Sequence, residues 1–578
     1  MSSCRIHCLV SLAMLCLGCE PREDVREVPS TWPFPLTASP MTSTRGMVAT
    51  DAPLATLVGA DVLSARGNAV DAAVATAFAL AVVLPSAGNV GGGGFLVVHM
   101  ADGTNAALDF REVAPARATR DMFLDGQGNP TDRSLNGHLA AGVPGSVAGL
   151  WEAHRRFGSK PWAELVEPAI RLAEDGFVVD AAFANRVRRN SGRLAAFPAS
   201  ASLFVPGGQP LSAGSGWRNP DLAAVLRRIA ERGARGFYEG ETATLLVAEM
   251  ERGGGLISKD DLAAYRAKWR EPANMEYRGR RIISMPLPSS GGITLALMAN
   301  MLRVHPAGRT WWGSPDRLHL LAEASRRAFA VRNQYLGDPD FVQVPHERLL
   351  SQGFADTLFM SFSPTRATSS SNLDVGTGAD TEGTHTTHFS VVDPSGNAVG
   401  LTTTINTGFG SGVVVTGAGF LLNNEMDDFT SKPGSPNTFG LVQGEANAIA
   451  PGKRMLSSMT PTIVLDEQGG VLLVTGASGG PTIISTVWQI MSHVVDDGMD
   501  IAAAVSAPRI HHQHLPDSLS YDEGGFSPGT LAGLEERGHR LKPVSPGSIG
   551  IGASLMRSGS EWTGMADPRI AGSAAGPR

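Results

Sequence analysis

Residues 382–404, EGTHTTHFSVVDPSGNAVGLTTT, hold the pattern that decides the fold. Two runs of β-branched and apolar residues flank the tetrapeptide 393–396. In it, Pro suits the second position of a type I turn and Gly suits the left-handed position that follows. The pattern predicts a β-hairpin with a three-residue loop. Counting outward along its antiparallel strands places Thr386 opposite Thr404, and a slip of one residue would break this facing.

Thr386 marks a boundary between this hairpin and a segment of different composition. Residues 364–385 are small, polar and Gly-bearing, which is typical of an exposed, mobile segment. Cleavage of the His385–Thr386 bond would give Thr386 a free α-amine beside its own Oγ. Such an amine can serve as general base for the hydroxyl, so the sequence predicts a Thr nucleophile. The alternative for Thr386 is an ordinary strand residue.

Four blocks extend the pattern: DFREVAPARATRDMFLD (109–125), TTHFSVVD (386–393), LLNNEMDDF (421–429) and KRMLSSMTPTIV (453–464). Together, over about residues 46–568, they resemble the gamma-glutamyltransferase (gamma-glutamyltranspeptidase) family of N-terminal nucleophile hydrolases. The resemblance implies an α/β fold, the four-layer αββα sandwich of that type. It implies one globular unit from a self-cleaved precursor, with a large subunit (46–385) and a small subunit (386–578).

The resemblance also implies catalytic roles. Thr386 would attack the γ-glutamyl carbonyl, and Thr404 would orient its hydroxyl. The backbone amides of Gly479 and Gly480, at a predicted helix start, would form the oxyanion hole. The γ-glutamyl group of glutathione or a related compound would then pass to water, an amino acid or a peptide, with no cofactor.

The implied substrate-binding residues divide by the charge that they recognise. A γ-glutamyl group carries an α-carboxylate and an α-ammonium, so its site needs groups of both signs, and this set supplies both. The carboxylate would meet Arg111, Ser457 and Ser458, and the ammonium would meet Asn406, Glu425 and Asp428. Residues 431–442 resemble the loop that covers the pocket in lidded members, with Phe439 where some members carry Tyr.

Three alternatives stay open on the sequence. A cephalosporin or glutaryl acylase would share the fold and nucleophile but act on another acyl group. A catalytically dead envelope binding protein would not need the retained Thr386 and Thr404. An α/β-hydrolase would use Ser478, because 476–480 reads G-x-S-x-G between a strand and a helix. Its acid and base would follow in the order Asp496 or Asp497, then His511 or His512.

The composition and the positions of the cysteines exclude several other functions. The 578 residues carry a net charge of -7 with charges mixed along the chain, which predicts no nucleic-acid surface. All four cysteines lie within the first nineteen residues, so the body has no Cys nucleophile or Cys metal site. His319 and Glu323 share one predicted helix without further ligands nearby in the sequence. We therefore expect them to be structural, and expect no metal.

The N-terminus predicts export. Arg5 and His7 precede an apolar run at 8–17 that is too short to span a bilayer, as in a signal peptide. The run ends in Leu17-Gly18-Cys19, similar to a lipoprotein cleavage box in which Cys19 would carry the lipid, although Cys16 stands where such boxes usually have Leu. We expect a signal over 1–19, a linker over 20–45 and a periplasmic or envelope location in a bacterium. Simple secretion and a cytoplasmic protein are the alternatives.

Overall fold

The computed structural model describes residues 28–305, 310–373 and 386–577. The predicted signal with Cys19, and His385 on the far side of the predicted cleavage bond, lie outside these ranges. Within the described residues, none of the helices combines the length and apolarity that a membrane span needs.

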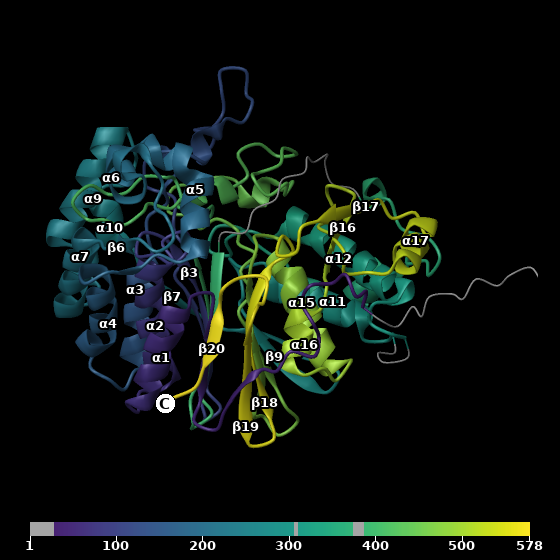
Figure 1. Ribbon diagram of the computed structural model, residues 1–578. Coiled ribbons are helices and arrows are strands. Elements are labelled where there is room, and N and C mark those ends of the chain that lie inside the picture. Colours follow the sequence, from purple (N-terminus) through teal and green to yellow (C-terminus); the bar gives the residue numbers. More distant parts are fainter. Residues whose placement is uncertain (1–27, 306–309, 374–385, 578) are drawn as a thin grey trace, which may run out of the picture.

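Two antiparallel sheets form the centre of the molecule (Figure 1). The seven-stranded sheet runs in the order β20 (Ser573–Ala575), β2 (Met47–Thr50), β10 (Thr386–Val392), β11 (Ala398–Thr404), β3 (Gly93–His99), β4 (Asn105–Asp109), β7 (Lys268–Arg270). The other runs in the order β1 (Met41–Ser43), β19 (Glu561–Ala566), β18 (Ile551–Ser558), β13 (Val471–Thr475), β12 (Thr462–Leu465), β9 (Arg280–Ser284), β8 (Ala273–Tyr277), with β14 (Ala477–Ser478) beside β18. Each sheet contains strands from the part of the chain before Thr386 and strands from the part that begins with it.

Helices cover the outer face of each sheet, which gives the predicted four-layer αββα order (Figure 1). One layer comprises α1 (Pro53–Ser64), α2 (Ala69–Val83), α3 (Ser146–Phe157), α4 (Trp162–Glu174), α5 (Ala181–Ala195), α6 (Pro198–Phe204), α7 (Pro220–Arg232), α8 (Arg235–Tyr238), α9 (Gly240–Gly253) and α10 (Lys259–Ala264). The other comprises α11 (Gly291–Leu302), α12 (Pro315–Tyr335), α13 (His346–Leu350), α14 (Gln352–Phe359), α15 (Thr482–Val495), α16 (Ile501–Ser506) and α17 (Pro528–Glu536).

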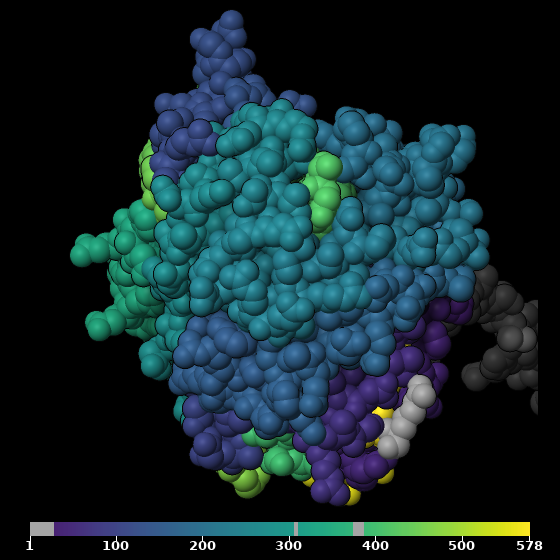
Figure 2. All heavy atoms as spheres, turned by 90° about the vertical axis from the view of Figure 1, so that its left-hand side faces the viewer, coloured from purple at the N-terminus to yellow at the C-terminus, as the bar shows by residue number. Residues whose placement is uncertain are grey.

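Smaller pairings complete the architecture. A three-stranded sheet of β15 (Ile510–His511), β16 (Leu519–Asp522) and β17 (Leu541–Val544) lies beside the second helical layer, and β5 (Phe177–Val178) pairs with β6 (Gly216–Trp217). Figure 2 shows the outer face of the first layer, where a green segment emerges among the blue and teal helices. In the chain, Thr416 and Gly417 are exposed between buried neighbours.

Apolar burial fixes these layers. One core cluster lies between the first helical layer and the seven-stranded sheet, and a second fills the space between the sheets and beneath α11 and α15. Helix α2 is buried on every side, as its nearly continuous apolar sequence predicts. Its start is fixed by a capping box in which Asn68 accepts from the Asp71 amide and Asp71 accepts from the Asn68 amide.

The glycine run at 91–94 lets the backbone approach the central hairpin. A Cβ added to Gly92 would lie 2.2 Å from the Thr404 carbonyl oxygen, and one on Gly94 would lie 2.4 Å from the Thr402 carbonyl oxygen. Neither backbone oxygen can move away without breaking the sheet. These glycines therefore serve close packing against β11.

The second half of the predicted linker is part of the folded body. Residues 41–43 form β1, which pairs with β19 at the edge of the eight-stranded sheet. Trp32 is buried, and its Nε1 donates to the Ser506 carbonyl at 3.1 Å. The charged and Pro-bearing composition hid these contacts because they depend on partners more than 450 residues away.

Candidate active site

The central hairpin has the predicted register. Strands β10 and β11 pair Thr386 with Thr404, and Gly396 in the connecting turn has a φ of 91°. The Thr386 Oγ lies 3.5 Å from the Thr404 Oγ. Thr404 is buried, and its Oγ accepts a hydrogen bond from the Asn406 amide at 2.8 Å. The hydroxyl of Thr386, which opens its strand, thus faces a second hydroxyl that the backbone holds in place.

Arg111 brings the charged residues of the site together. It follows the end of β4 and is buried, and its guanidinium pairs with both Glu425 and Asp428. These two acids lie in one turn of 3-10 helix, residues 425–428. Glu112 lies 3.9 Å from the same guanidinium. In this structure the proposed carboxylate-binding group and the proposed ammonium-binding groups therefore pair with each other.

This cluster contains more acid than base. Burial raises the pKa of Glu112, Glu425 and Asp428, and the Arg111 guanidinium opposes the rise without cancelling it. The pKa of Glu112 reaches about 7. Arg111 pairs with these carboxylates and Arg332 also favours the ionised form of Asp428, yet the pKa of all three acids stays raised, so a further cation placed here would be favoured.

Arg332, which the sequence analysis missed, supports the two predicted serines. This buried residue of α12 donates to the Ser458 Oγ at 3.0 Å and to the Ser290 Oγ at 2.9 Å. Ser290 in turn donates through its amide and hydroxyl to the Ser457 carbonyl. Burial lowers the pKa of Arg332 to about 10. In the sequence, Arg332 is only one of several charged residues in a predicted helix, and nothing there indicates that it is buried.

One pocket gathers all the predicted site residues except Gly479 and His385. Its lining comprises Arg111, Arg332, Thr386, Thr404, Asn406, Glu425, Asp428, Phe439, Leu441, Leu456, Ser457, Ser458, Met459, Gly480, Pro481 and Ile483. We call it the nucleophile pocket. Charged groups of both signs thus lie around the hydroxyl of Thr386, as recognition of a zwitterion requires.

The two predicted oxyanion glycines precede helix α15 and both have positive φ, 135° for Gly479 and 58° for Gly480. A Cβ on Gly479 would lie 2.9 Å from the Gly550 Cα, and one on Gly480 would lie 2.9 Å from the Phe439 ring. Backbone conformation and space both require glycine here. Gly480 lines the nucleophile pocket, whereas Gly479 faces a neighbouring pocket.

The comparisons with known proteins match this geometry. The family model described as gamma-glutamyltranspeptidase matches residues 55–577. The chain is 46% identical over 533 residues to the glutathione hydrolase proenzyme of Escherichia coli (strain K12), covering 92% of this chain and 91% of that protein. This chain belongs to the gamma-glutamyltranspeptidase family. The glutathione hydrolase proenzyme of Pseudomonas aeruginosa is 47% identical over 491 residues, covering 84% of this chain and 86% of that one.

A solved structure supports the fold of this gamma-glutamyltranspeptidase family member. The crystal structure of cephalosporin acylase from Bacillus halodurans superposes with a TM-score of 0.84 at 28% identity, covering 95% of this chain and 99% of that one. The fold is thus shared with an acylase, while the identity to the two glutathione hydrolase proenzymes named above is higher.

The serine hydrolase alternative is wrong for this family member. Ser478 is buried in β14, paired with Ile551 of β18, rather than exposed on a sharp turn. His511 bonds to the Ser485 hydroxyl and to Gln513. Asp496 is held by Arg278, Arg317 and Tyr277, and Asp497 lies beside His493. Chain order suited a triad, but the fold gives its members other partners.

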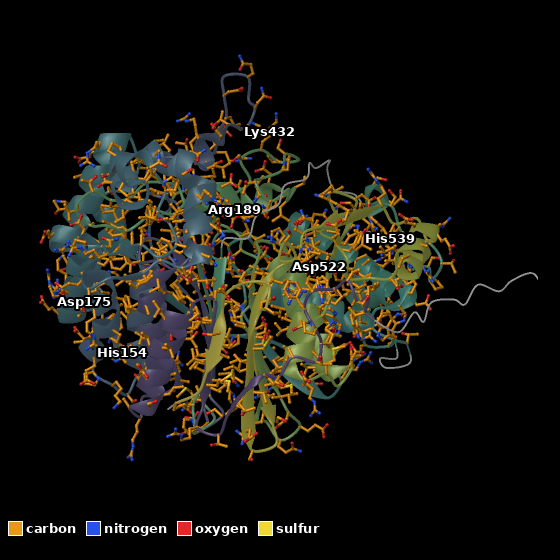
Figure 3. The ribbon with its side chains drawn as sticks, viewed as in Figure 1. His154, Asp175, Arg189, Lys432, Asp522 and His539 are labelled. Atoms are coloured by element: carbon orange, nitrogen blue, oxygen red, sulfur yellow. The ribbon has the colours of Figure 1, made fainter. Side chains whose placement is uncertain are left out.

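His319 and Glu323 gain a neighbour that the sequence did not indicate, His539, which Figure 3 shows on the side of α17. One possible ligand atom from each lies within 4.8 Å of the others. However, His319 Nδ1 bonds to His539 Nε2 at 2.7 Å, and the Glu323 carboxylate pairs with Arg326 and Arg327. These bonds occupy the atoms that a metal would need, which favours the structural interpretation.

Proposed function

We propose that this chain is the precursor of a gamma-glutamyltransferase and glutathione hydrolase, which cleaves itself before Thr386 and then uses Thr386 as its nucleophile. One observation carries the proposal: the hydroxyl of Thr386 faces Thr404 in a pocket that also holds Arg111 and Asp428. The names of the two glutathione hydrolase proenzymes support it. The acceptor is water, an amino acid or a peptide, and the mature protein consists of residues up to 385 and from 386.

The reaction follows from the positions of these groups. The α-amine of the new N-terminus takes the proton from the Thr386 Oγ as the oxygen attacks the γ-carbonyl carbon. The amides of Gly479 and Gly480 stabilise the oxyanion, and the amine returns the proton to the departing nitrogen. The C–N bond breaks and a γ-glutamyl ester of Thr386 remains. Water or an acceptor amine then attacks this ester and regenerates the hydroxyl.

Substrate binding replaces the internal pairing of the site. The α-carboxylate of the substrate takes the place of a protein carboxylate at Arg111, with the hydroxyls of Ser457 and Ser458 beside it. The α-ammonium then pairs with the released Asp428 and Glu425, near Asn406. Each protein charge exchanges one partner for another, so no charge is left buried alone. The acylase alternative lacks this balance, because a glutaryl group has no ammonium.

Self-cleavage is tested by intact-mass analysis of the purified protein. We expect two chains with a new N-terminus at Thr386, and release of the anilide from γ-glutamyl-p-nitroanilide. Thr386→Ala should remain one chain and be inactive, whereas Thr386→Ser should cleave and retain part of the activity because it keeps a hydroxyl. Cleavage of Thr386→Ala at the same bond would exclude the proposed nucleophile.

Export as a lipoprotein is a separate proposal that rests on the N-terminal sequence. Cys19 would be lipidated and would hold the enzyme at the bacterial envelope. Detergent extraction should find the protein with membranes, and Cys19→Ala should release it. Equal partitioning of both forms would remove the lipid anchor and leave the enzymatic proposal intact.

A further inference from the structure

Four buried histidines lie close together beside α12, on the side of the molecule where Figure 3 labels His539. His319 belongs to α12, His512 and His514 follow β15, and His539 precedes β17. We call them the histidine cluster. His319 bonds to His539, and His512 accepts a hydrogen bond from the His514 amide. One member comes from the chain before Thr386 and three from the chain after it, so the cluster joins both parts of the molecule.

The cluster holds residues 363–370, a segment that lies before Thr386 in the chain and that we call the strap. The His319 Nε2 bonds to the Ser363 carbonyl at 2.7 Å, and the His514 Nε2 bonds to the Ser370 carbonyl at 3.1 Å. The Ser370 hydroxyl donates in return to the His514 carbonyl at 2.6 Å. The backbone of the strap is thus bound by a histidine at each end.

The charged groups that face the cluster already have partners among themselves. They are Glu323, Arg326, Arg327, Asp517 and Arg537. Glu323 pairs with Arg326 and Arg327, and Arg537 pairs with Asp316. Asp517 lies 3.5 Å from the His512 Nε2, but it also pairs with Arg326 and accepts from the Ser370 amide at 2.9 Å. Both acids are therefore shared before any histidine becomes charged.

The hydrogen bonds fix the histidines in neutral forms. Because a carbonyl only accepts, His319 and His514 carry their proton on Nε2. The His319 Nδ1 then accepts from the His539 Nε2 at 2.7 Å, and the His512 Nδ1 accepts from an amide at 3.1 Å. The Nδ1 atoms of His514 and His539 are buried and have no partner among the described residues. A further proton would thus meet either an occupied nitrogen or a site without an acceptor, which is costly in a buried place.

The pKa values of the cluster have the direction that this geometry requires. Burial lowers the pKa of all four histidines from the ordinary 6.5, and the Arg326 guanidinium lowers it further. For His512 and His539 the pKa falls to about 3. Such a histidine binds its proton more tightly when the contacts are open. Its contribution to stability is complete above about pH 6.5 and is lost as the pH falls towards about 3.

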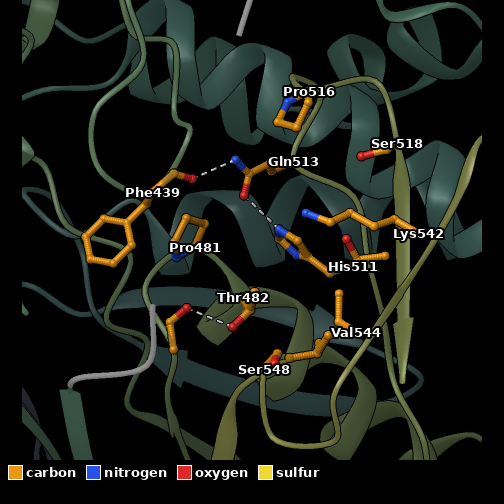
Figure 4. A pocket seen from close by; sticks show the side chains of 13 residues that line it. Phe439, Pro481, Thr482, His511, Gln513, Pro516, Ser518, Lys542, Val544 and Ser548 are labelled. Atoms are coloured by element: carbon orange, nitrogen blue, oxygen red, sulfur yellow. Dashed lines mark hydrogen bonds between the residues drawn. The ribbon is translucent and has the colours of Figure 1, made fainter. Parts of the chain in front are cut away.

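The cluster shares a loop with residues beside the nucleophile pocket. Gln513 lies between two of the histidines, and its Nε2 donates to the Phe439 carbonyl at 3.1 Å (Figure 4). The Phe439 ring packs against Gly480, where an added Cβ would lie 2.9 Å from it. Opening of the cluster would therefore free a loop that contacts the surroundings of the proposed oxyanion hole.

We propose that the histidine cluster is an acid-sensitive clamp, which holds the strap while its histidines are neutral and releases it when they take up protons. The inference goes beyond the proposed function. It does not depend on self-cleavage, because a cut before Thr386 removes none of these contacts.

The test follows amide hydrogen exchange in the strap by mass spectrometry at pH 7.5 and pH 5.0, corrected for the intrinsic exchange rate at each pH. The reporting amides are those of Ala367, Thr368 and Ser370, which are all bonded in the folded protein. At pH 5.0 each histidine exposed by opening favours the open state by about 30-fold, because its ordinary pKa lies about 1.5 pH units higher. Exchange in the unmodified protein should therefore rise at least about 30-fold.

His514→Gln and His539→Gln separate proton uptake from the contacts themselves. Glutamine keeps a side-chain amide that can donate in place of Nε2, but it takes up no proton. Each variant should lower the acid-induced rise about tenfold, and the double variant should lower it more. At pH 7.5 the strap should exchange as in the unmodified protein, which shows that the variants fold.

His154→Gln is the matched control. His154 of α3 is also partly buried and bonds through Nε2 to a backbone carbonyl, that of Lys160, at 2.7 Å, but it lies on the opposite side of the molecule (Figure 3). It should keep the full acid-induced rise. An equal rise in the cluster variants and this control, or a strap that stays protected at pH 5.0 in the unmodified protein, would overturn the inference. Neither result bears on self-cleavage or anilide hydrolysis at pH 7.5, which test the proposed function separately.

Discussion

Two buried clusters of ion pairs differ in their balance of charge. The cluster around Arg111 has one guanidinium within ion-pair distance of three carboxylates, Glu112, Glu425 and Asp428, and Arg332 acts on Asp428 from further away. The C-terminal cluster, where Figure 3 labels Asp522, sets two against two: Arg509 and Arg569 with Asp522 and Asp567. Both clusters are buried. They differ in whether the number of guanidiniums matches the number of carboxylates.

The pKa shifts express the same contrast. Burial alone would raise the pKa of Asp567, but Arg509 and Arg569 outweigh it and hold this pKa below its ordinary range. Asp522 remains raised by burial. In the cluster around Arg111 the pKa of every carboxylate is raised. We therefore expect the balanced cluster to stabilise the fold and the acid-rich cluster to be completed by a cationic ligand.

The largest expected effect concerns the ligand that completes the acid-rich cluster. We expect kcat/KM for a γ-glutamyl anilide to exceed that for a glutaryl anilide by about 10⁴-fold, because the glutaryl group leaves buried acceptors without their ammonium. Asp428→Asn should narrow this gap by lowering the rate on the γ-glutamyl substrate. Comparable rates on both anilides with the unmodified enzyme would instead support an acylase.

A substitution in the balanced cluster should lower the stability of the protein. Asp567→Asn leaves two buried guanidiniums with one carboxylate, so the free energy of unfolding should fall by about 3–5 kcal/mol. Asp428→Asn, in the acid-rich cluster, should change it by less than about 1 kcal/mol. Denaturant titration of the two variants measures both quantities. Equal losses would show that the two clusters do not differ in role.

The smallest effect is a dependence of stability on pH. The pKa of Glu112 is raised to about 7, chiefly by burial, so the folded state holds this proton more tightly than the unfolded chain does. Its contribution to stability is present below about pH 4.5 and is lost as the pH rises to about 7. Glu112→Gln should flatten the fall in stability over this range, by about 1–2 kcal/mol. An unchanged profile would show that Glu112 is ionised throughout.

Local chemistry made the centre of the fold predictable. The Pro and Gly of the 393–396 turn set the register that pairs Thr386 with Thr404, because turn type fixes strand pairing. The members of the nucleophile pocket came from the family resemblance, and the fold brings them together. Arg332 could not be found in this way, because its role depends on the burial of α12 and on the contact with Ser458 that this brings about.

Long-range pairing explains the main errors. The strand at 41–43 finds its partner in β19, at the other end of the chain, and its own sequence carries no strong strand pattern. Ser478 had the spacing of a nucleophile elbow, but the neighbouring β18 extends pairing across it. The spacing of residues along the chain predicts contacts between near neighbours. Contacts between residues several hundred positions apart depend on how the whole core packs.

The mixing of strands in the seven-stranded sheet has a consequence for the life of the enzyme. Strand β10 pairs with β2, and β11 pairs with β3, so the central ladders join residues on opposite sides of the bond before Thr386. A cut there would separate nothing in the folded state. Once unfolded, however, the two pieces would have to find each other by diffusion, and recovery would depend on concentration. The uncut precursor folds as a single molecule, so the covalent link serves assembly and becomes dispensable once the sheet is complete.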